Sequence, residues 1–338
     1  MDSIEITDRL LAKDLSVERN IQMLLDALEC LKEDGHAMKL KEAGFIARDS
    51  IQKLLRRHPT QRAIDFYWHS ILLLAPYDFD SYMLYMEKDR LSESRFYKPR
   101  RRLLRKHGAV QLFQDLEDDV LDIGGISMVP GAGKTTLEGF AASWVLGKYP
   151  EEYSIFVSHT TNIDKMFYDS VLNLTTDPEY NWGEIFPGVK LESTNAKDYL
   201  INFGGFKPFK SLSCIALGQN IAGRVRASKY MFCDDLVSRM EEAVNNARLE
   251  KLWQMYTGDL LQRKIEGCKE VHVATRWSVN DPLGKVQRAN EGNPRARFIA
   301  IPDIDAETGE SNFDYEDGKG FSVAYFTKVA EQMDEISY

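Results

Sequence analysis

The chain of 338 residues is 43% hydrophobic and 28% charged, and it has a formal net charge of −9 at pH 7. This composition is that of a folded globular protein with room for about two domains, which excludes a disordered or fibrous chain. Because proteins that bind nucleic acid over a broad surface are usually basic, any contact with DNA is expected to be local or weak.

The sequence carries no targeting signal that we can identify. No apolar run approaches the roughly 18 residues that a membrane-spanning helix needs, and the acidic start Met-Asp-Ser-Ile-Glu-Ile lacks a signal-peptide pattern. The four cysteines are scattered without a Cys-x-x-Cys pair, and the six histidines show no metal-ligand spacing. We therefore expect reduced thiols, no zinc site, no membrane partner and a location inside the cell.

Residues 1–92 are predicted to form a helical region. Apolar residues recur at helical spacing from Ile21 to Leu31, and Gly35 is expected to end that helix. Two further apolar stretches end before Pro59 and Pro76. No chemistry can be assigned to this region, which is expected to be a small helical domain or a docking arm.

Residues 93–338 show a different pattern, in which short apolar runs alternate with helical ones. Strands are predicted at 123–129, 153–159, 212–217, 229–233, 271–275 and 297–301, and helices at 136–146, 162–174 and 241–265. Such alternation predicts an α/β fold with a mostly parallel sheet flanked by helices. In these sheets the ligand lies at the carboxyl ends of the strands.

A glycine-rich turn follows the first predicted strand and precedes a predicted helix. This order of elements is the setting of a phosphate-binding P-loop, whose backbone N–H groups surround phosphate oxygens at a helix N-terminus. Met128 occupies the position where the common pattern has its first glycine, so the loop is a variant. The expected nucleotide contacts are Pro130, Gly131, Ala132, Gly133, Lys134, Thr135 and Thr136. Lys134 would reach the β- and γ-phosphates, and the Thr135 hydroxyl would bind Mg²⁺.

Two consecutive acids follow a predicted buried strand, Tyr-Met-Phe-Cys-Asp-Asp. A buried acid is costly unless it meets a cation, so Asp234 is the expected Mg²⁺ partner. Asp235, on the alternate side of the strand end, is the candidate that polarises the attacking water. The alternative is a strand that simply runs into a polar loop.

Two further residues are candidates for contacts with the γ-phosphate. Arg224 lies on a Gly-containing loop ten positions before Asp234 and could act in its own subunit or in a neighbour. Arg226 is its rival, and a surface arginine without a role is the other alternative. Thr275, at the end of another predicted strand, could sense the γ-phosphate or could merely cap the next loop.

Three segments in this order resemble the ATPase part of the large terminase subunit of tailed bacteriophages and prophages. They are Val-Pro-Gly-Ala-Gly-Lys-Thr-Thr, Phe-Cys-Asp-Asp-Leu-Val and Ala-Thr-Arg-Trp-Ser-Val-Asn-Asp-Pro-Leu-Gly-Lys. The resemblance covers roughly residues 95–330. It implies an ASCE-type P-loop NTPase that uses ATP and Mg²⁺ to drive double-stranded DNA into a procapsid.

The resemblance also implies partners and residue roles. The partners would be DNA, a portal protein, a small terminase subunit and further copies of the chain in a ring, in the cytoplasm of a host bacterium. Asp234 would be the metal-side acid, Asp235 the catalytic carboxylate, Arg224 a trans-acting arginine finger and Thr275 the residue that couples hydrolysis to movement. Many members have Glu where this chain has Asp235, so the positioning of water could differ.

Family members also carry a C-terminal nuclease, and the sequence after Ile304 is too short to build one, so we expect no DNA cleavage by this chain. Three other interpretations stay open: a small-molecule kinase, a helicase-like ATPase, and an assembly module that does not hydrolyse nucleotide. The base-binding residues are also open, with Tyr97, Arg101 and Gln114 as candidates upstream of the loop.

Overall fold

The computed structural model describes residues 2–221, 223–315, 318 and 320–332. Contacts between Cα atoms divide the chain into two units. The first comprises Met1–Arg90 with Pro178–Pro187, and the second comprises Leu91–Asp177 with Gly188–Tyr338. None of the helices in the described part of the chain is long and apolar enough to cross a membrane.

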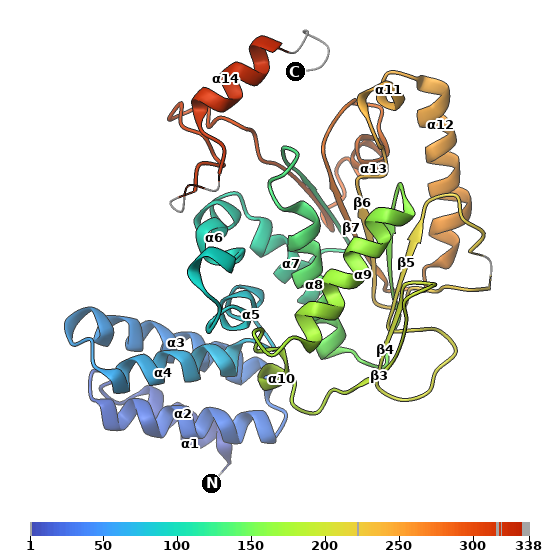
Figure 1. The fold of residues 1–338 in the computed structure, drawn as a ribbon. Helices are drawn as coiled ribbons and strands as arrows, with labels where there is room; N and C mark the ends of the chain where they lie inside the picture. Colours follow the sequence, from blue (N-terminus) through green and yellow to red (C-terminus); the bar gives the residue numbers. More distant parts are fainter. Residues whose placement is uncertain (1, 222, 316–317, 319, 333–338) are drawn as a thin grey trace. The chain divides into compact units, whose positions relative to one another are not determined.

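The first unit is helical (Figure 1). Its elements are α1 (Ser3–Leu11), α2 (Glu18–Glu33), α3 (Ala37–Arg57), α4 (Gln61–Leu74), α5 (Phe79–Met86) and the short α10 (Trp182–Ile185). The predicted apolar face of α2 is buried, with Leu24, Leu25 and Leu28 at 0% exposure. Gly35 follows α2 with a φ of 76°, as expected of a glycine that ends a helix. The segment with α10 is held by Tyr85, whose hydroxyl donates to Glu184 Oε2 at 2.6 Å.

The second unit is α/β, with an eight-stranded sheet in the order β3-β4-β5-β2-β6-β7-β1-β8. The strands are β1 (Ile123–Ser127), β2 (Ser154–Ser158), β3 (Leu191–Asn195), β4 (Leu200–Phe203), β5 (Leu212–Ala216), β6 (Tyr230–Asp234), β7 (Lys269–Ala274) and β8 (Ala296–Ala300). All pairs from β5 to β8 in this order are parallel, and β3 and β4 add an antiparallel edge. The predicted mostly parallel sheet is confirmed.

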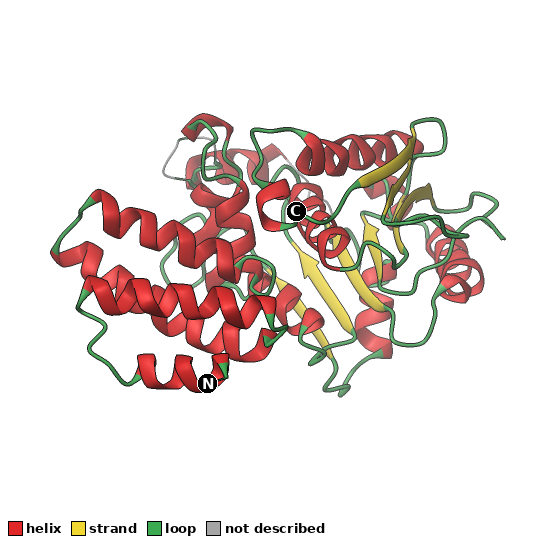
Figure 2. Ribbon diagram, turned by 90° about the horizontal axis from the view of Figure 1, so that it is seen from below, coloured by secondary structure: helices red, strands yellow, loops and turns green. Residues whose placement is uncertain are grey.

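Helices pack on both faces of this sheet (Figure 2). On one face lie α7 (Ala109–Glu117), α8 (Lys134–Lys148) and α9 (Thr161–Thr176). On the other lie α12 (Asn246–Met255), the π-helical turn η2 (Tyr256–Leu260) and α13 (Pro282–Ala289). The remaining elements are η1 (Ser92–Ser94), α6 (Tyr97–Lys106), α11 (Met240–Ala243), η3 (Leu261–Arg263) and α14 (Val323–Gln332).

Gly124 and Gly125 allow these layers to approach β1 closely. A Cβ atom on Gly124 would lie 2.5 Å from the Leu112 side chain of α7, and one on Gly125 would lie 2.4 Å from Phe298 of β8. Both distances are under 3.0 Å, so a side chain at either position would force Leu112 or Phe298 to move.

The structure corrects one prediction from the sequence and adds two strands. The single helix predicted at 241–265 is instead broken into α11, α12, η2 and η3. The break lies at Asn245, whose side chain accepts a hydrogen bond from the Arg248 N–H and so starts a new helix. Strands β3 and β4 were not predicted, and β3 is exposed along its whole length.

Candidate functional site

A glycine loop, residues 128–133, joins β1 to α8 at the carboxyl edge of the sheet. Gly131 and Gly133 have φ angles of 76° and 95°, which glycine adopts without steric penalty. Gly133 is the N-cap of α8, so the first N–H groups of this helix belong to the edge of the loop. The predicted order of strand, glycine turn and helix is present.

The side chain of Lys134 is folded over the glycine loop. It is 6% exposed, and its Nζ donates hydrogen bonds to Thr275 Oγ1 (2.7 Å) and to the carbonyl oxygens of Met128 (3.4 Å) and Val129 (3.3 Å). The same Nζ lies 3.7 Å from Asp235 Oδ2. Met128 therefore takes part through its backbone carbonyl, which every residue type carries.

Thr135 and Asp234 are brought into direct contact. The Thr135 hydroxyl donates to Asp234 Oδ2 at 2.5 Å. Asp234 is 1% exposed, and its Oδ1 has no hydrogen-bond partner among the described residues. Burial, with a smaller contribution from Asp235, raises the pKa of the Asp234 carboxyl to about 7. A buried carboxyl with an unmatched oxygen beside a threonine hydroxyl fits a hard divalent cation such as Mg²⁺.

Asp235 is held in an unusual backbone conformation directly after β6. Its φ angle is 41°, in the left-handed region that non-glycine residues rarely adopt. Its N–H donates to the Val273 carbonyl at 2.9 Å, and its Oδ1 accepts from the Thr275 N–H at 2.6 Å. Strained residues held by several contacts are common at functional sites. Asp235 and Thr275, both predicted site residues, are thus fixed against each other.

His159 is a site residue that the sequence analysis missed. It follows β2, and its Nδ1 lies 2.6 Å from the carbonyl oxygen of Asp235. Because a carbonyl only accepts, Nδ1 must carry the proton, and in the neutral ring Nε2 is then an acceptor. The sequence position of His159 could have revealed it, because a polar residue directly after a buried parallel strand lies at the edge of the sheet where ligands bind.

Glu138 is a second residue that the sequence analysis missed. It lies one turn after Lys134 on α8, is 0% exposed, and both of its carboxylate oxygens lack hydrogen-bond partners among the described residues. Burial raises the pKa of the Glu138 carboxyl, and the charges of Asp234 and Asp235 raise it further. Three carboxyls thus interact electrostatically with Lys134, and a bound divalent cation would favour their charged forms.

A cavity of about 340 Å³ opens among these groups. We call it the phosphate cavity. Its lining residues come from the glycine loop, the start of α8 and the ends of β2, β6 and β7, namely Pro130, Gly131, Gly133, Lys134, Thr135, Thr136, His159, Asp235, Val237, Ser238, Thr275 and Trp277. Ala132, also predicted as a contact, is 3% exposed and is not among them.

The structure does not bring Arg224 or Arg226 to this cavity. Arg224 lies on the loop after β5, and its Nη2 pairs with Asp198 Oδ1 at 3.1 Å. Its side chain is 60% exposed, and Arg226 is also exposed. Lys134 is the only lysine or arginine among the described residues that line the phosphate cavity.

The segment after β7 forms a compact connection from Thr275 to α13. Arg276 Nε donates to Asp281 Oδ2 at 3.0 Å, and Asp281 is the N-cap of α13, where its Oδ1 accepts from the Gly284 N–H at 2.7 Å. A Cβ atom on Gly284 would lie 2.3 Å from the Val279 carbonyl oxygen, so only glycine fits there. The residue next to Thr275 is therefore tied to the start of a helix.

Comparison with models of known protein families gives no match for this chain, and comparison with curated proteins gives none either. Support for a function therefore comes from the residues and distances described above.

Proposed function

We propose that this chain is the ATP-hydrolysing motor domain of a viral DNA-packaging terminase large subunit, with an ASCE-type P-loop fold. The observation that carries the proposal is the set of contacts around Thr275. Its hydroxyl accepts from Lys134 Nζ at 2.7 Å, and its N–H donates to Asp235 Oδ1 at 2.6 Å. A single strand end thus links a phosphate-binding lysine to the carboxylate expected to act on water.

The strand order supports the same proposal. β7 lies between β1, which leads into the glycine loop, and β6, which ends in the two acids. In this proposal Thr275, the residue after β7, would lie between the bound phosphates and Asp235. This is the position from which a residue could sense the γ-phosphate, as the sequence pattern suggested for Thr275.

Each residue then has a role in phosphoryl transfer to water. Lys134 and the N–H groups of residues 131–136 would bind the β- and γ-phosphates. Thr135 and Asp234 would hold Mg²⁺, which when bound offsets the negative charge of the phosphate oxygens. Asp235 would orient the attacking water and accept its proton.

Arg224 would act on a neighbouring subunit in a ring. Its exposed position outside its own phosphate cavity is consistent with action in trans. The ring, the double-stranded DNA, the portal and small-subunit partners, and a place in the cytoplasm of a host bacterium are parts of this proposal that rest on the resemblance of the sequence motifs.

The test is phosphate release from ATP with and without linear double-stranded DNA. We expect hydrolysis that DNA stimulates and that Lys134→Ala abolishes. Hydrolysis that no DNA stimulates, together with phosphate transfer to a small-molecule acceptor, would support a kinase instead. The absence of phosphate release in every condition would leave only a binding or assembly role.

A further inference from the structure

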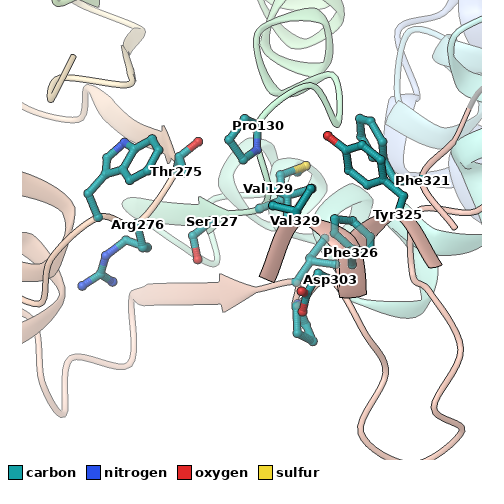
Figure 3. A pocket seen from close by; sticks show the side chains of 14 residues that line it. Ser127, Val129, Pro130, Thr275, Arg276, Asp303, Phe321, Tyr325, Phe326 and Val329 are labelled. Atoms are coloured by element: carbon teal, nitrogen blue, oxygen red, sulfur yellow. The ribbon is translucent and has the colours of Figure 1, made fainter. Parts of the chain in front are cut away.

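A second cavity, of about 380 Å³, adjoins the phosphate cavity. Figure 3 shows the side chains that line this second cavity. The two cavities share Pro130, Thr275 and Trp277 in their walls. The rest of the second cavity is built from the end of β1, the start of the glycine loop, Arg276, residues 301–303 after β8, and the chain from Phe321 into α14. The two cavities are therefore neighbours, and a ligand bound in the phosphate cavity lies next to the second one.

The second cavity has an aromatic wall. The rings of Phe321 and Tyr325 stack with centroids 5.0 Å apart, and the ring of Phe326 lies 5.8 Å from that of Phe321. Val129 and Pro130 lie across from these rings in Figure 3. Flat apolar surfaces of this kind suit a planar aromatic group.

The aromatic wall begins at the glycine loop itself. A Cβ atom on Gly131 would lie 3.1 Å from Cζ of Phe321. The ring of Phe321 thus lies close to the loop at Gly131, which is one of the expected phosphate contacts and lines the phosphate cavity.

The charges of the second cavity argue against another phosphate site. Arg276 is the only lysine, arginine or histidine among the described lining residues, and it is engaged by Asp281 at 3.0 Å and by Gln287 at 3.2 Å. Its guanidinium points away from the aromatic wall in Figure 3. The carboxyl of Asp303 also lines the cavity, and its Oδ1 accepts a hydrogen bond from the Ile304 N–H at 2.8 Å. A carboxylate oxygen can accept more than one hydrogen bond, so this group suits donors such as an amino group.

We propose that the second cavity binds the purine base of the nucleotide whose phosphates bind at Lys134. The base would pack against Tyr325 and Phe321, with its exocyclic amino group toward Asp303. This inference rests on the proposed function, because it needs a nucleotide in the phosphate cavity. It replaces the candidates from the sequence, since Tyr97, Arg101 and Gln114 line neither cavity.

The test compares two ligands that differ in the base. Calorimetry measures the affinity of the whole chain for MgATP and for magnesium tripolyphosphate, which has no base or sugar. We expect the wild type to bind MgATP more tightly. Tyr325→Ala is expected to weaken MgATP binding about tenfold, within the range for the loss of a base-stacking ring, and to leave tripolyphosphate binding unchanged.

Tyr325 suits this test because it is 49% exposed, so its loss should not disturb folding. Phe206→Ala is the matched control, because Phe206 is 95% exposed and lies outside both cavities. Tyr325→Leu, which keeps an apolar side chain without the ring, is expected to give an intermediate loss.

Three outcomes would overturn the inference. If neither Tyr325→Ala nor Phe321→Ala changes the ratio of the affinities for MgATP and tripolyphosphate, the base site is contradicted. The proposed function is not affected by that result. An equal loss for both ligands would show a general structural effect in place of base recognition. A wild-type chain that binds neither ligand would contradict the proposed function as well.

Discussion

Asp235 has a φ angle of 41°, and four contacts hold it there: those from His159, Val273, Thr275 and, at 3.7 Å, Lys134. The conformation is costly for a residue with a side chain, so these contacts must offset the strain. The His159 contact is the one that can be altered without touching the carboxylate or the lysine.

Two substitutions of His159 distinguish the contribution of its Nδ1 from that of its Nε2. Asparagine places an N–H donor near the position of Nδ1 and can keep the bond to the Asp235 carbonyl, whereas glutamine extends toward the position of Nε2 and loses that bond. We expect His159→Asn to keep much of the wild-type kcat and His159→Gln to resemble His159→Ala, with KM for ATP similar in all three. Steady-state kinetics measure this. Equal kcat for the asparagine and glutamine variants would show that the bond to Asp235 does not matter.

The buried carboxyl of Asp234 predicts a dependence of stability on pH. Burial raises its pKa in the folded chain to about 7 from the ordinary 3.8, so the metal-free folded chain holds this proton more tightly than the unfolded chain does. The resulting stabilisation is present at low pH and is lost as the pH rises through about 7. The pKa of Glu138 is raised in the same direction, but Glu138 is present in both wild type and Asp234→Asn, so a comparison of the two isolates the contribution of Asp234.

We therefore expect Asp234→Asn without metal to melt at a higher temperature than wild type at pH 8 and at a similar temperature near pH 4. Added Mg²⁺ is expected to raise the melting temperature of wild type at pH 8 and to leave the variant unchanged, because a bound ion stabilises only the chain that binds it. Differential scanning calorimetry measures both effects. A magnesium response retained in full by the variant would count against Asp234 as a ligand.

At the scale of elements, the parallel strands could be predicted and the antiparallel edge could not. β2, β5 and β6 are buried along their whole length, so they appear in the sequence as continuous apolar runs. β3 is exposed throughout and reads Leu-Glu-Ser-Thr-Asn, which carries no strand periodicity. Its pairing with β4 is a tertiary contact that local sequence does not encode.

The connection from Thr275 to α13 predicts a variant that hydrolyses ATP without coupling it to DNA. Arg276, the residue next to Thr275, donates a hydrogen bond to Asp281, the N-cap of α13. Lys285 of α13 in turn pairs with Glu250 of α12 at 2.5 Å. We expect Arg276→Ala to keep basal hydrolysis and to lose stimulation by DNA. Arg248→Ala is the control, because Arg248 is an exposed arginine of α12. A phosphate-release assay measures both rates. DNA stimulation equal to that of wild type would exclude Arg276 from coupling.

At the scale of the whole molecule, the site has one feature that the sequence predicted and another that it could not. The glycine loop and the two acids are short local patterns whose chemistry is readable from residue type. The second cavity joins residues from the ranges 127–130, 275–277, 301–303 and 321–329, which are far apart in the chain. The aromatic residues of its last segment have the spacing of an ordinary helix core, so only the fold reveals their position beside the loop.

The exposed position of Arg224 predicts complementation between copies. If its guanidinium acts on a neighbour, a mixture of Arg224→Ala and Lys134→Ala chains should hydrolyse ATP faster than either alone, because intact lysine sites would meet intact arginines. The same mixture made with Arg226→Ala tests the rival. The absence of any gain at protein concentrations that give oligomers would argue against action in trans.

The most direct test of the central claim is the rate of ATP hydrolysis by wild type and by Lys134→Ala, measured across protein concentrations that span monomer and oligomer. The contacts of Lys134 with Thr275, and through it with Asp235, predict hydrolysis by wild type that depends on Mg²⁺ and is lost in the variant. A wild-type rate no higher than that of Lys134→Ala at every concentration would contradict the account.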